Sequence, residues 1–358
     1  MTIFHFSAKM DLMKALILAG GLGTRLRPLT LTTPKSILPL VNKPLLLYQI
    51  ELFKKYGIEK IILSVSYLPE QISHSFGDGK KYGVKISYAH EKERLGTGGG
   101  VKNSEEFIEG RTFISNGDII ANIDLKKMNA FHQKHKSDVT IALFRVTDPT
   151  AYGLVKTNQE GRILNFLEKP KSSEITTDTI NAGFYLFEPE ILQFIPPKIN
   201  YSLERGLFPN LLRKGKRLFG YIHSDYWQDL GTPEKYFGVS ADILDGKLDY
   251  RIPGKKIRKN LTTGADSKIA KGVEVKGKLV CGKKVRIEKN VQVSGAVILG
   301  DNCKIEKGVK LVNCIIFANA KVKEGVEIDN AIIGRDCFIG PYNKIGKGTV
   351  LGNGSLIQ

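Results

Sequence analysis

A glycine-rich turn followed by three cations is the feature of this chain best suited to chemistry. Between Leu18 and Pro44 the sequence reads LAGGLGTRLRPLTLTTPKSILPLVNKP, directly after an apolar run. Glycines after a strand let backbone N–H groups approach a phosphate, and Arg25, Arg27 and Lys35 can neutralise several phosphates. A lone GxG would indicate only a tight turn, but here glycines and cations coincide. The segment therefore predicts a polyphosphate site.

The spacing differs from two common phosphate-binding fingerprints. Leu26 stands where a GxGxxG dinucleotide motif has its third glycine, and no Gly-Lys-Ser/Thr follows at the spacing of a Walker loop.

Two carboxylates offer further chemistry, because Asp118 follows the apolar run TFIS and Asp229 lies in WQDLG. Either aspartate alone would more often be a cap or turn residue. Converging from separate segments, they can hold Mg²⁺ together with phosphate oxygens.

The elements that must position these residues alternate along residues 14–240. Strands are expected at 14–19, 61–65, 85–89, 112–115 and 139–146, and helices at 45–56, 100–107 and 125–135. This alternation predicts an α/β fold with a Rossmann-like, mostly parallel sheet covered by helices. In such sheets ligands bind beyond the carboxyl ends of the strands, which is where the glycine turn and Asp118 fall.

A period of six residues replaces this pattern in the C-terminal part. The apolar position recurs at Ile269, Val275, Cys281, Ile287, Val293, Leu299, Ile305 and Leu311. One-residue slips restart the phase at Ile316 and at Ile333, and the repeat continues to Leu351. Hexapeptide repeats of this kind predict a left-handed parallel β-helix, here of about four to five turns at three hexads per turn.

The two patterns divide the chain into a catalytic domain at 14–240, a connector at 241–262 and a β-helix domain at 263–358. Residues 1–13 are expected to form an extension ahead of the first strand, not a signal peptide, because Lys9 and Asp11 interrupt any apolar stretch. No apolar run approaches the ~20 residues that a membrane-spanning helix needs, so no membrane association is expected.

The net charge is strongly positive, since 54 Lys+Arg exceed 36 Asp+Glu by 18. Residues 251–358 hold 21 basic and 9 acidic side chains, so two thirds of the excess lies in the β-helix part. Nucleic-acid binding is not expected, because this part has few aromatic side chains for base stacking: Phe317, Phe338 and Tyr342. The charge is better explained by lysines on the outer faces of the coils.

The four cysteines all fall in the C-terminal part and form no CxxC pair: Cys281, Cys303, Cys314 and Cys337. No histidine follows His223, so neither a zinc site nor the histidine-dependent acyl transfer of some hexapeptide-repeat enzymes is expected there. We expect buried, reduced thiols and a cytoplasmic location.

Taken together, the motifs resemble those of the sugar-nucleotide pyrophosphorylases, which join a sugar 1-phosphate to a nucleoside triphosphate and release pyrophosphate. After the glycine turn the resemblance rests on LGTGGG (95–100), NGD (116–118), YGLV (152–155), FLEKP (166–170), NAG (181–183) and WQDLGTP (227–233), in that order. The β-helix resembles the C-terminal domain of the long form of this family.

The resemblance implies a role for each motif. Arg25 would stabilise the departing pyrophosphate and Lys35 the nucleotide phosphates, while Asp118 and Asp229 hold Mg²⁺. The implied nucleotide contacts are Leu18, Gly20, Gly21, Gly23, Thr24, Glu91, Gly96 and Thr97. The implied sugar-phosphate contacts are Gly153, Glu168, Lys169 and Asn181. In the implied reaction a phosphate oxygen of the sugar 1-phosphate attacks the α-phosphorus of the nucleotide in line.

The identity of the base rests on Glu91. A carboxylate can accept both adjacent N–H donors of guanine, whereas relatives specific for thymine or uracil tend to carry Gln five residues before the glycine that corresponds to Gly96. GTP is therefore the expected nucleotide. Mannose 1-phosphate is the expected sugar, because NKPLLLYQIELFKKYGI and SVSYLPE resemble the guanylyl branch of the family.

Three departures from the family pattern keep other substrates open: PKSI, NGD and the glycine at 206 in SLERGLFP. The alternatives are a glucose-1-phosphate thymidylyl- or uridylyltransferase, and a catalytically inactive regulatory subunit. Retention of the proposed catalytic residues argues for activity. The β-helix is expected to mediate homo-oligomerisation, because its flat faces and end coils leave surface for stacking.

Overall fold

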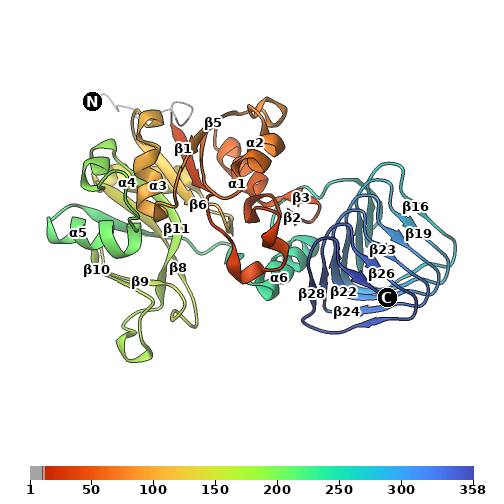
Figure 1. Cartoon of the computed structure of the whole chain (residues 1–358). Coiled ribbons are helices and arrows are strands. Elements are labelled where there is room, and N and C mark those ends of the chain that lie inside the picture. The colour runs from red at the N-terminus through yellow and green to blue at the C-terminus, as the bar shows by residue number, and fades with distance from the viewer. Residues whose placement is uncertain (1–9, 11–12) are drawn as a thin grey trace, which may run out of the picture. The chain divides into compact units, whose positions relative to one another are not determined.

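The computed structural model describes residue 10 and residues 13–358, so the extension expected at residues 1–13 lies almost wholly outside the described part. The chain forms two compact units (Figure 1). The first comprises residues up to Gly21 and Tyr48–Trp227, and the second comprises Leu22–Leu47 and Gln228–Gln358. The glycine turn is thus divided between them. No helix in the described part is both long and apolar enough to cross a membrane.

Within the described residues the first unit is built on a nine-stranded sheet whose first half is parallel. Its order β6-β1-β4-β5 is formed by β6 (Thr112–Asn116), β1 (Lys14–Leu18), β4 (Lys60–Val65) and β5 (Lys85–His90). The expected strands are confirmed here. The register places the end of β1 beside the ends of β4 and β6, so three strands finish at one edge.

The second half of this sheet contains antiparallel pairs. It consists of β8 (Val139–Arg145), β9 (Gly153–Thr157), β10 (Ile163–Glu168), β11 (Thr179–Phe187) and β12 (Leu218–Ile222). Strand β11 runs antiparallel to β6, β8 and β9. The reversal at β11 brings a second set of predicted site residues onto the sheet.

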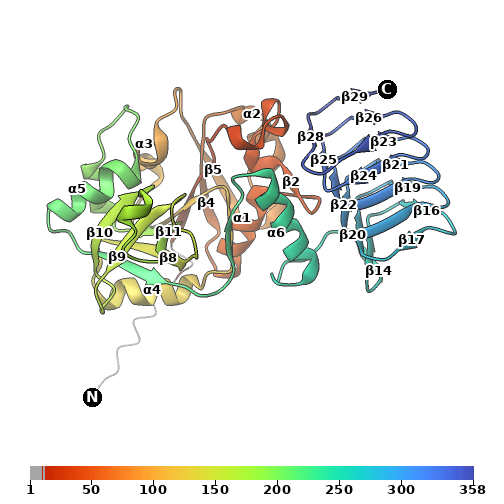
Figure 2. The ribbon, with the colours of Figure 1, turned by 90° about the horizontal axis from the view of Figure 1, so that it is seen from below.

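Four helices accompany the first half of the chain (Figure 2): α1 (Leu45–Lys55), α2 (Pro69–Phe76), α3 (Gly96–Asn103) and α4 (Leu125–Lys134). Helix α3 packs on β1, β4 and β5, and α4 packs on β8 and β12. The expected helix at 100–107 is wrong in its limits, because α3 begins at Gly96 and a separate turn covers 105–107. Backbone N–H groups of Gly98 and Gly99 donate to Tyr201 O (2.8 and 3.1 Å), so the glycines form the first helical turn.

Further strands and helices belong to the two units. They are β2 (Pro39–Leu40), β3 (Lys43–Pro44), β7 (Ile119–Ala121), β13 (Trp227–Asp229), α5 (Phe208–Arg213) and α6 (Pro233–Asp245). The segment expected as a connector, 241–262, begins inside α6 and ends within a hairpin made by β14 (Lys255–Arg258) and β15 (Leu261–Thr263).

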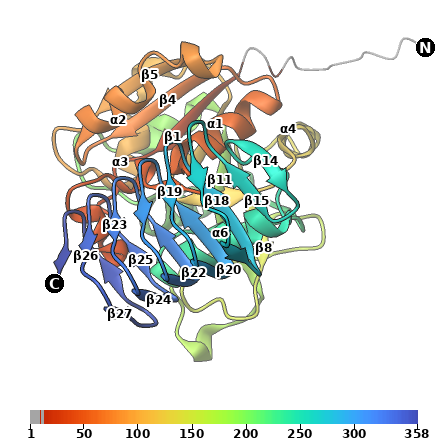
Figure 3. The same ribbon diagram turned by 90° about the vertical axis from the view of Figure 1, so that its right-hand side faces the viewer.

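The C-terminal part is a parallel β-helix whose coils follow one another in Figure 3. One face is formed by β16 (Lys268–Ile269), β19 (Arg286–Ile287), β21 (Lys304–Ile305), β23 (Lys321–Val322), β26 (Phe338–Ile339) and β29 (Leu356–Ile357). The other rungs are β17 (Glu274–Val275), β18 (Lys278–Cys281), β20 (Gln292–Leu299), β22 (Lys310–Ile316), β24 (Glu327–Asp329), β25 (Ile332–Ile333), β27 (Lys344–Ile345) and β28 (Val350–Leu351).

The pairing register confirms both the hexads and the slips. Lys268 pairs with Arg286, 18 residues later, as three hexads require. Lys304 pairs with Lys321, only 17 residues later, because the first slip removes one residue from that coil. The periodic apolar residues form one buried cluster, with Ile269, Val275 and Leu351 partly buried at its ends.

All four cysteines are free and buried inside this cluster, as expected: Cys281, Cys303, Cys314 and Cys337. Two of them donate to carbonyls of the next coil. Cys303 Sγ lies 3.1 Å from Phe317 O, and Cys337 Sγ lies 3.1 Å from Gly352 O. The thiols therefore act as small packing groups with weak hydrogen bonds.

These thiols are expected to resist modification in the folded chain. Burial raises the pKa of Cys281 and of Cys303 to about 12, and the thiolate is the reactive form. Ellman's reagent at about pH 8 should find almost no thiol in the native protein and all four after denaturation in urea. Rapid stoichiometric labelling of the native chain would contradict this burial.

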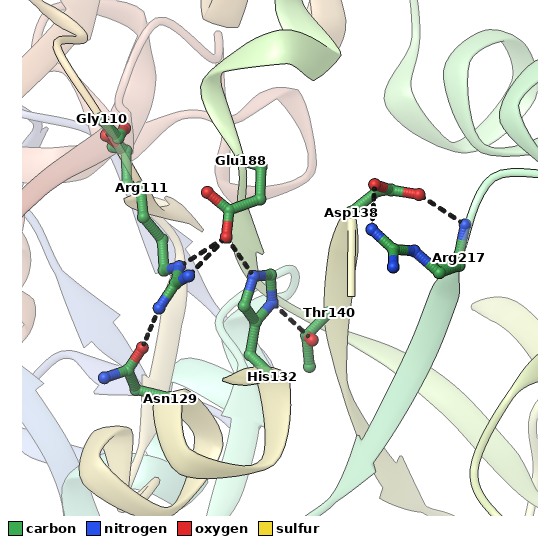
Figure 4. A network of polar contacts seen from close by, with 9 residues as sticks. Gly110, Arg111, Asn129, His132, Asp138, Thr140, Glu188 and Arg217 are labelled. Atoms are coloured by element: carbon green, nitrogen blue, oxygen red, sulfur yellow. Dashed lines mark hydrogen bonds and ion pairs between the residues drawn. The ribbon is translucent and has the colours of Figure 1, made fainter. Parts of the chain in front are cut away.

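A partly buried polar network lies at the edge of the sheet at which β6 and β8 begin (Figure 4). Arg111 donates through Nε and Nη2 to Glu188 Oε1 (2.8 and 2.6 Å) and through Nη1 to Asn129 Oδ1 (3.2 Å). His132 Nε2 lies 3.1 Å from the same Glu188 oxygen, and Nδ1 lies 2.8 Å from Thr140 Oγ1. Burial alone would raise the pKa of Glu188, but the bonds from His132 and Arg111 outweigh it and lower that pKa.

A second pair lies at the same edge. Asp138, just before β8, accepts the Arg217 backbone N–H (2.7 Å) and its Nη2 (3.2 Å) in the same view (Figure 4). Both sets of contacts join strand ends far apart in sequence. They lie opposite the edge at which β1, β4 and β6 finish, so we assign them to stability.

His223 is a buried histidine whose imidazole ring forms no hydrogen bond within the described residues. It follows β12, is 5% exposed, and neither ring nitrogen has a hydrogen-bond partner among the described residues. Its ring packs 5.2 Å from that of Phe144, which stacks on Trp227 at 5.5 Å. This apolar environment disfavours the charged imidazolium.

The free energy of unfolding should therefore fall in mild acid. Burial lowers the pKa of His223 from 6.5 to about 4. The unfolded chain binds this proton near pH 6.5 and the folded chain only near pH 4, so up to ~3 kcal/mol is lost across that interval. His223→Phe should reduce this loss in urea unfolding midpoints between about pH 7 and 4.5, and the exposed His74→Gln should not. Equal pH dependence in all three proteins would contradict the assignment.

Candidate functional site

The first group of predicted residues gathers at the carboxyl ends of β1, β4 and β5. Glu91 follows β5, and its carboxylate accepts the Ser64 hydroxyl (2.7 Å) and the Leu95 N–H (3.0 Å). A methyl group at Gly20 would come within 3.3 Å of Glu91 Oε1, and one at Gly100 within 3.0 Å. Each carboxylate oxygen keeps a second lone pair, so Glu91 can accept further donors while these bonds fix its position.

The same group includes the last residue of β1 and the turn after β6. Leu18 Cδ2 would lie 3.3 Å from a methyl group at Gly100, and Leu18 O accepts the Gly117 N–H (2.9 Å). A side chain at Gly117 would strike Leu18 O at 2.7 Å, so glycine is needed for this approach. Asp118 is therefore held, half-buried, next to the end of β1.

A substitution at Gly21 can distinguish a ligand-binding role of this glycine from a structural one. It is exposed, its φ is not positive, and a methyl group there would meet nothing within 4 Å. If phosphates approach this backbone, Gly21→Ala should leave the melting temperature unchanged and raise the KM for the nucleotide about 10-fold or more. Gly110→Ala, which also meets nothing, is the matched control. Unchanged kinetics in Gly21→Ala would remove this residue from the site.

Gly96 and Thr97 are bound to the segment at 201–204. Gly96 has a φ of +73°, and a side chain there would strike Tyr201 O at 2.8 Å. Thr97 Oγ1 donates to Glu204 Oε2 (2.8 Å) and accepts the Leu203 N–H (2.9 Å). The Thr97 hydroxyl thus attaches the first turn of α3 to the segment at 201–204. The LGTGGG motif alone did not predict this contact.

The predicted sugar-phosphate residues meet on β9, β10 and β11. Gly153 pairs with Glu168 in register, and a methyl group at Gly153 would come within 2.8 Å of Glu168 Oε2. Asn181 donates through Nδ2 to Tyr185 Oη (2.9 Å) and accepts the Gly183 N–H through Oδ1 (2.9 Å). The absence of a side chain at Gly153 therefore lets the Glu168 carboxylate lie close to the backbone of β9, and the Asn181 amide is fixed on the neighbouring strand.

Lys169 follows Glu168 in an unusual backbone conformation. Its φ is +50°, its N–H donates to Tyr152 O (3.0 Å), and it is exposed. Positive φ in a residue other than glycine is costly and is concentrated at binding sites. The turn directs the chain away from β10 immediately after the carboxylate.

Glu204 connects the two groups of the first unit and was missed by sequence reasoning. It accepts Tyr185 Oη (3.3 Å), Ser202 Oγ (2.8 Å) and the Thr97 hydroxyl. Burial raises the pKa of Glu168, and the nearby Glu204 raises it further. Apart from Ser202, the side chains bonded to Glu204 lie 19 and 107 residues away, so no local pattern joins Glu204 to them.

The second unit holds the remaining predicted catalytic residues. A methyl group at Gly231 would come within 2.6 Å of Asp229 Oδ2 and within 2.8 Å of Arg25 Cζ. The Asp229 carboxylate and the Arg25 guanidinium therefore both approach the space that a side chain would occupy at buried Gly231, close to one another. Lys235, in the first turn of α6, forms an ion pair with Asp229. Sequence spacing gave no reason to join Lys235 to this site.

Lys35 and Gly23 form another contact in this unit. Gly23 has a φ of +60°, and a methyl group there would lie 3.0 Å from Lys35 Cβ and from Thr30 Cγ2. Lys35 is only 9% exposed, whereas Thr24 and Arg25 are exposed in the short turn Thr24–Leu26. The stem of Lys35 is therefore fixed under the glycine turn.

Asp118 in the first unit and Asp229 in the second each offer a carboxylate of the kind that hard divalent cations prefer. Asp118 and Asp229 are half-buried carboxylates, and the ion pair with Lys235 shows that Asp229 already attracts a positive charge. In the described residues no three His, Cys, Asp or Glu side chains form a cluster. Mg²⁺ does not require one, because it commonly uses one or two protein carboxylates with waters and phosphate oxygens.

A Rossmann-like sheet with a glycine turn after β1, followed by a left-handed β-helix, defines a nucleotide-binding transferase architecture. The chain matches the family described as nucleotidyl transferase over residues 14–246 and the EIF2B subunit epsilon LbH domain over residues 258–358. It belongs to the nucleotidyl transferase family. The resemblance stated from the motifs is thereby confirmed.

Related proteins agree with this assignment. The chain is 43% identical, over 65% of its length and 65% of the relative, to a protein of Mycobacterium tuberculosis named mannose-1-phosphate guanylyltransferase. It is 36% identical, over 95% of its length and 91% of the relative, to mannose-1-phosphate guanyltransferase of Aspergillus oryzae. A solved structure of HddC from Yersinia pseudotuberculosis complexed with GMP-PN has a TM-score of 0.57 at 29% identity, covering 64% of this chain and 99% of that one.

Proposed function

We propose that this chain transfers a guanylyl group from GTP to mannose 1-phosphate, giving GDP-mannose and pyrophosphate. The observation that carries the proposal is the placement of Arg25 and Asp229 around Gly231. A cation for a leaving pyrophosphate and a carboxylate for a metal ion are the groups that nucleotidyl transfer requires. The relatives named as guanylyltransferases and the GMP-PN complex of HddC support guanine as the base.

In this mechanism the protein supplies position and charge without a covalent intermediate. Glu91 accepts the guanine donors while Ser64 and Leu95 fix its carboxylate. Glu168 and Asn181 bind sugar hydroxyls, and Lys169 binds the sugar phosphate. These groups orient a phosphate oxygen for attack on the α-phosphorus.

The basic side chains are assigned to the nucleotide phosphates and to the pyrophosphate that leaves. Arg25 neutralises the pyrophosphate as it departs, and Lys35 neutralises the phosphates of the bound nucleotide. Asp118 and Asp229 would hold Mg²⁺, which neutralises phosphate charge when bound.

We include in the proposal a homo-oligomer in the cytoplasm formed through the β-helix, where Tyr342 (69% exposed) and Leu356 (60% exposed) offer apolar surface.

The test is a substrate panel. The full-length chain is incubated with Mg²⁺, one of GTP, ATP, UTP or dTTP, and mannose or glucose 1-phosphate, and pyrophosphate release is measured. GTP with mannose 1-phosphate should give the highest kcat/KM. A relative of Synechocystis, 34% identical and named UTP--glucose-1-phosphate uridylyltransferase, makes UTP with glucose 1-phosphate the competing outcome. Silence with every pair would refute the enzyme assignment.

A further inference from the structure

The segment that carries Arg25 and Lys35 belongs to the same compact unit as the β-helix. Residues 22–47 group with 228–358 and not with the sheet that follows them in sequence. Within 22–37 the local structure consists only of three short 3-10 turns: Thr24–Leu26, Leu29–Leu31 and Lys35–Ile37. Such turns fix few backbone angles for each hydrogen bond, so this segment depends on outside contacts for a single conformation.

One outside contact comes from the last coil of the β-helix. Asn353 Nδ2 donates to Thr32 Oγ1 (2.9 Å) and to Thr33 Oγ1 (3.2 Å), across more than 300 residues of sequence. Next to it, a methyl group at Gly352 would lie 3.2 Å from Pro28 Cβ, so the coil backbone lies close to the segment. The contact points at 28 and 32–33 fall between Arg25 and Lys35.

Further contacts hold the end of the segment. Asn42 Nδ2 donates to Leu299 O of the β-helix (2.9 Å). Tyr236 Oη of α6 donates to Pro39 O (2.6 Å), and its buried ring lies 6.4 Å from that of Phe317 in the β-helix. The segment is therefore joined to the β-helix both beside the proposed catalytic cations and after them.

Asn353 is itself rigidly placed. Its Oδ1 accepts the Arg335 N–H (2.9 Å) from the preceding coil, so the amide cannot flip without losing this bond. Thr33 is 5% exposed, and a polar group so buried is costly to leave without a partner. The amide oxygen of Asn353 is thus fixed by the β-helix, and its Nδ2 group donates to the segment at 22–47.

We propose that Asn353 is a positioning residue for Arg25 and Lys35, and that the last coil of the β-helix is part of the catalytic apparatus. The inference rests on the proposed function for its effect on turnover. The β-helix then has a role in each subunit that does not depend on oligomerisation: it keeps the two cations in the geometry that a leaving pyrophosphate requires.

Asn353→Ala in the full-length protein tests this role. We expect about 10-fold lower kcat with the KM for mannose 1-phosphate unchanged, because the sugar-binding groups lie in the other unit. Asn353→Asp should recover most of the activity, since the threonine hydroxyls can donate to a carboxylate. Asn343→Ala is the matched control, because within the described part of the chain its side-chain amide donates to Gly340 O in its own turn (3.1 Å) and not to the segment at 22–47. Equal rates in the Ala variants would overturn the proposal.

Two further measurements keep the test decisive. Hydrogen exchange across residues 22–40 should accelerate in Asn353→Ala and not in Asn343→Ala; equal protection overturns the positioning role whether or not the wild type is active. Wild-type inactivity would refute only the proposed function. If Asn353→Ala does not fold, Thr33→Val breaks one of the contacts from the other side. In a cycle of Thr33→Val and Asn353→Ala, additive effects on kcat would also contradict the proposal.

Discussion

Replacing Arg25 with alanine is expected to lower kcat about 10²- to 10³-fold while the fold remains intact. The guanidinium is exposed in a short turn, so its removal leaves no cavity in the core. Removal of one preorganised group that stabilises developing charge has this magnitude in other enzymes. The loss should appear in kcat more than in the KM for mannose 1-phosphate, because Arg25 is assigned to the leaving pyrophosphate.

The measurement is steady-state pyrophosphate release, with the melting temperature as the check on folding. Arg258→Ala removes an exposed arginine from β14 in the same unit and should retain wild-type turnover. A near-normal kcat for Arg25→Ala would contradict the assignment of this side chain to the departing group. An equal loss in Arg258→Ala would point to overall charge instead.

Gly231→Ala is expected to reduce kcat about 100-fold. The added methyl group would lie 2.6 Å from Asp229 Oδ2 and 2.8 Å from Arg25 Cζ, distances that neither side chain can keep. Both proposed catalytic groups must therefore move, and displacements of about 1 Å in a preorganised site cost about this factor. This substitution therefore tests whether turnover requires the observed positions of both Asp229 and Arg25.

The control for this substitution lies in the helix that follows. Gly238 is within α6, and a methyl group there would meet nothing within 4 Å. Gly238→Ala should keep full activity and gain slightly in stability, because alanine is the better helix former. Full activity in Gly231→Ala would show that the geometry around Asp229 and Arg25 is not needed for turnover.

The regular parts of the fold could be predicted because their residues repeat. Buried runs such as 61–65 are apolar except at Ser64, as expected of a strand covered on both faces. The hexads predicted the β-helix down to the two slips, because each coil must return its apolar residue to the same inner face. A regular pattern of apolar residues indicates which positions are buried. The strands and coils that were predicted are the elements with such buried positions.

The parts that could not be predicted depend on contacts between distant segments. The first turn of α3, Gly96–Gly99, lies ahead of the helix expected at 100–107, and its glycines allow close packing on Tyr201. Glu204 and Lys235 lie at no characteristic spacing from the residues that they contact. Nor does any pattern within 22–47 show that this segment joins the β-helix, because Asn353 and Asn42 are ordinary turn residues in sequence.

The central claim is nucleotidyl transfer by attack at the α-phosphorus of GTP, and the fate of labelled phosphate tests it most directly. The full-length chain is incubated with mannose 1-phosphate, Mg²⁺ and GTP labelled at either the α or the γ position. The account predicts that the α label appears in GDP-mannose and the γ label in pyrophosphate, in equal amounts. Label from the γ position in a sugar product, or α label released as free GMP without GDP-mannose, would contradict it.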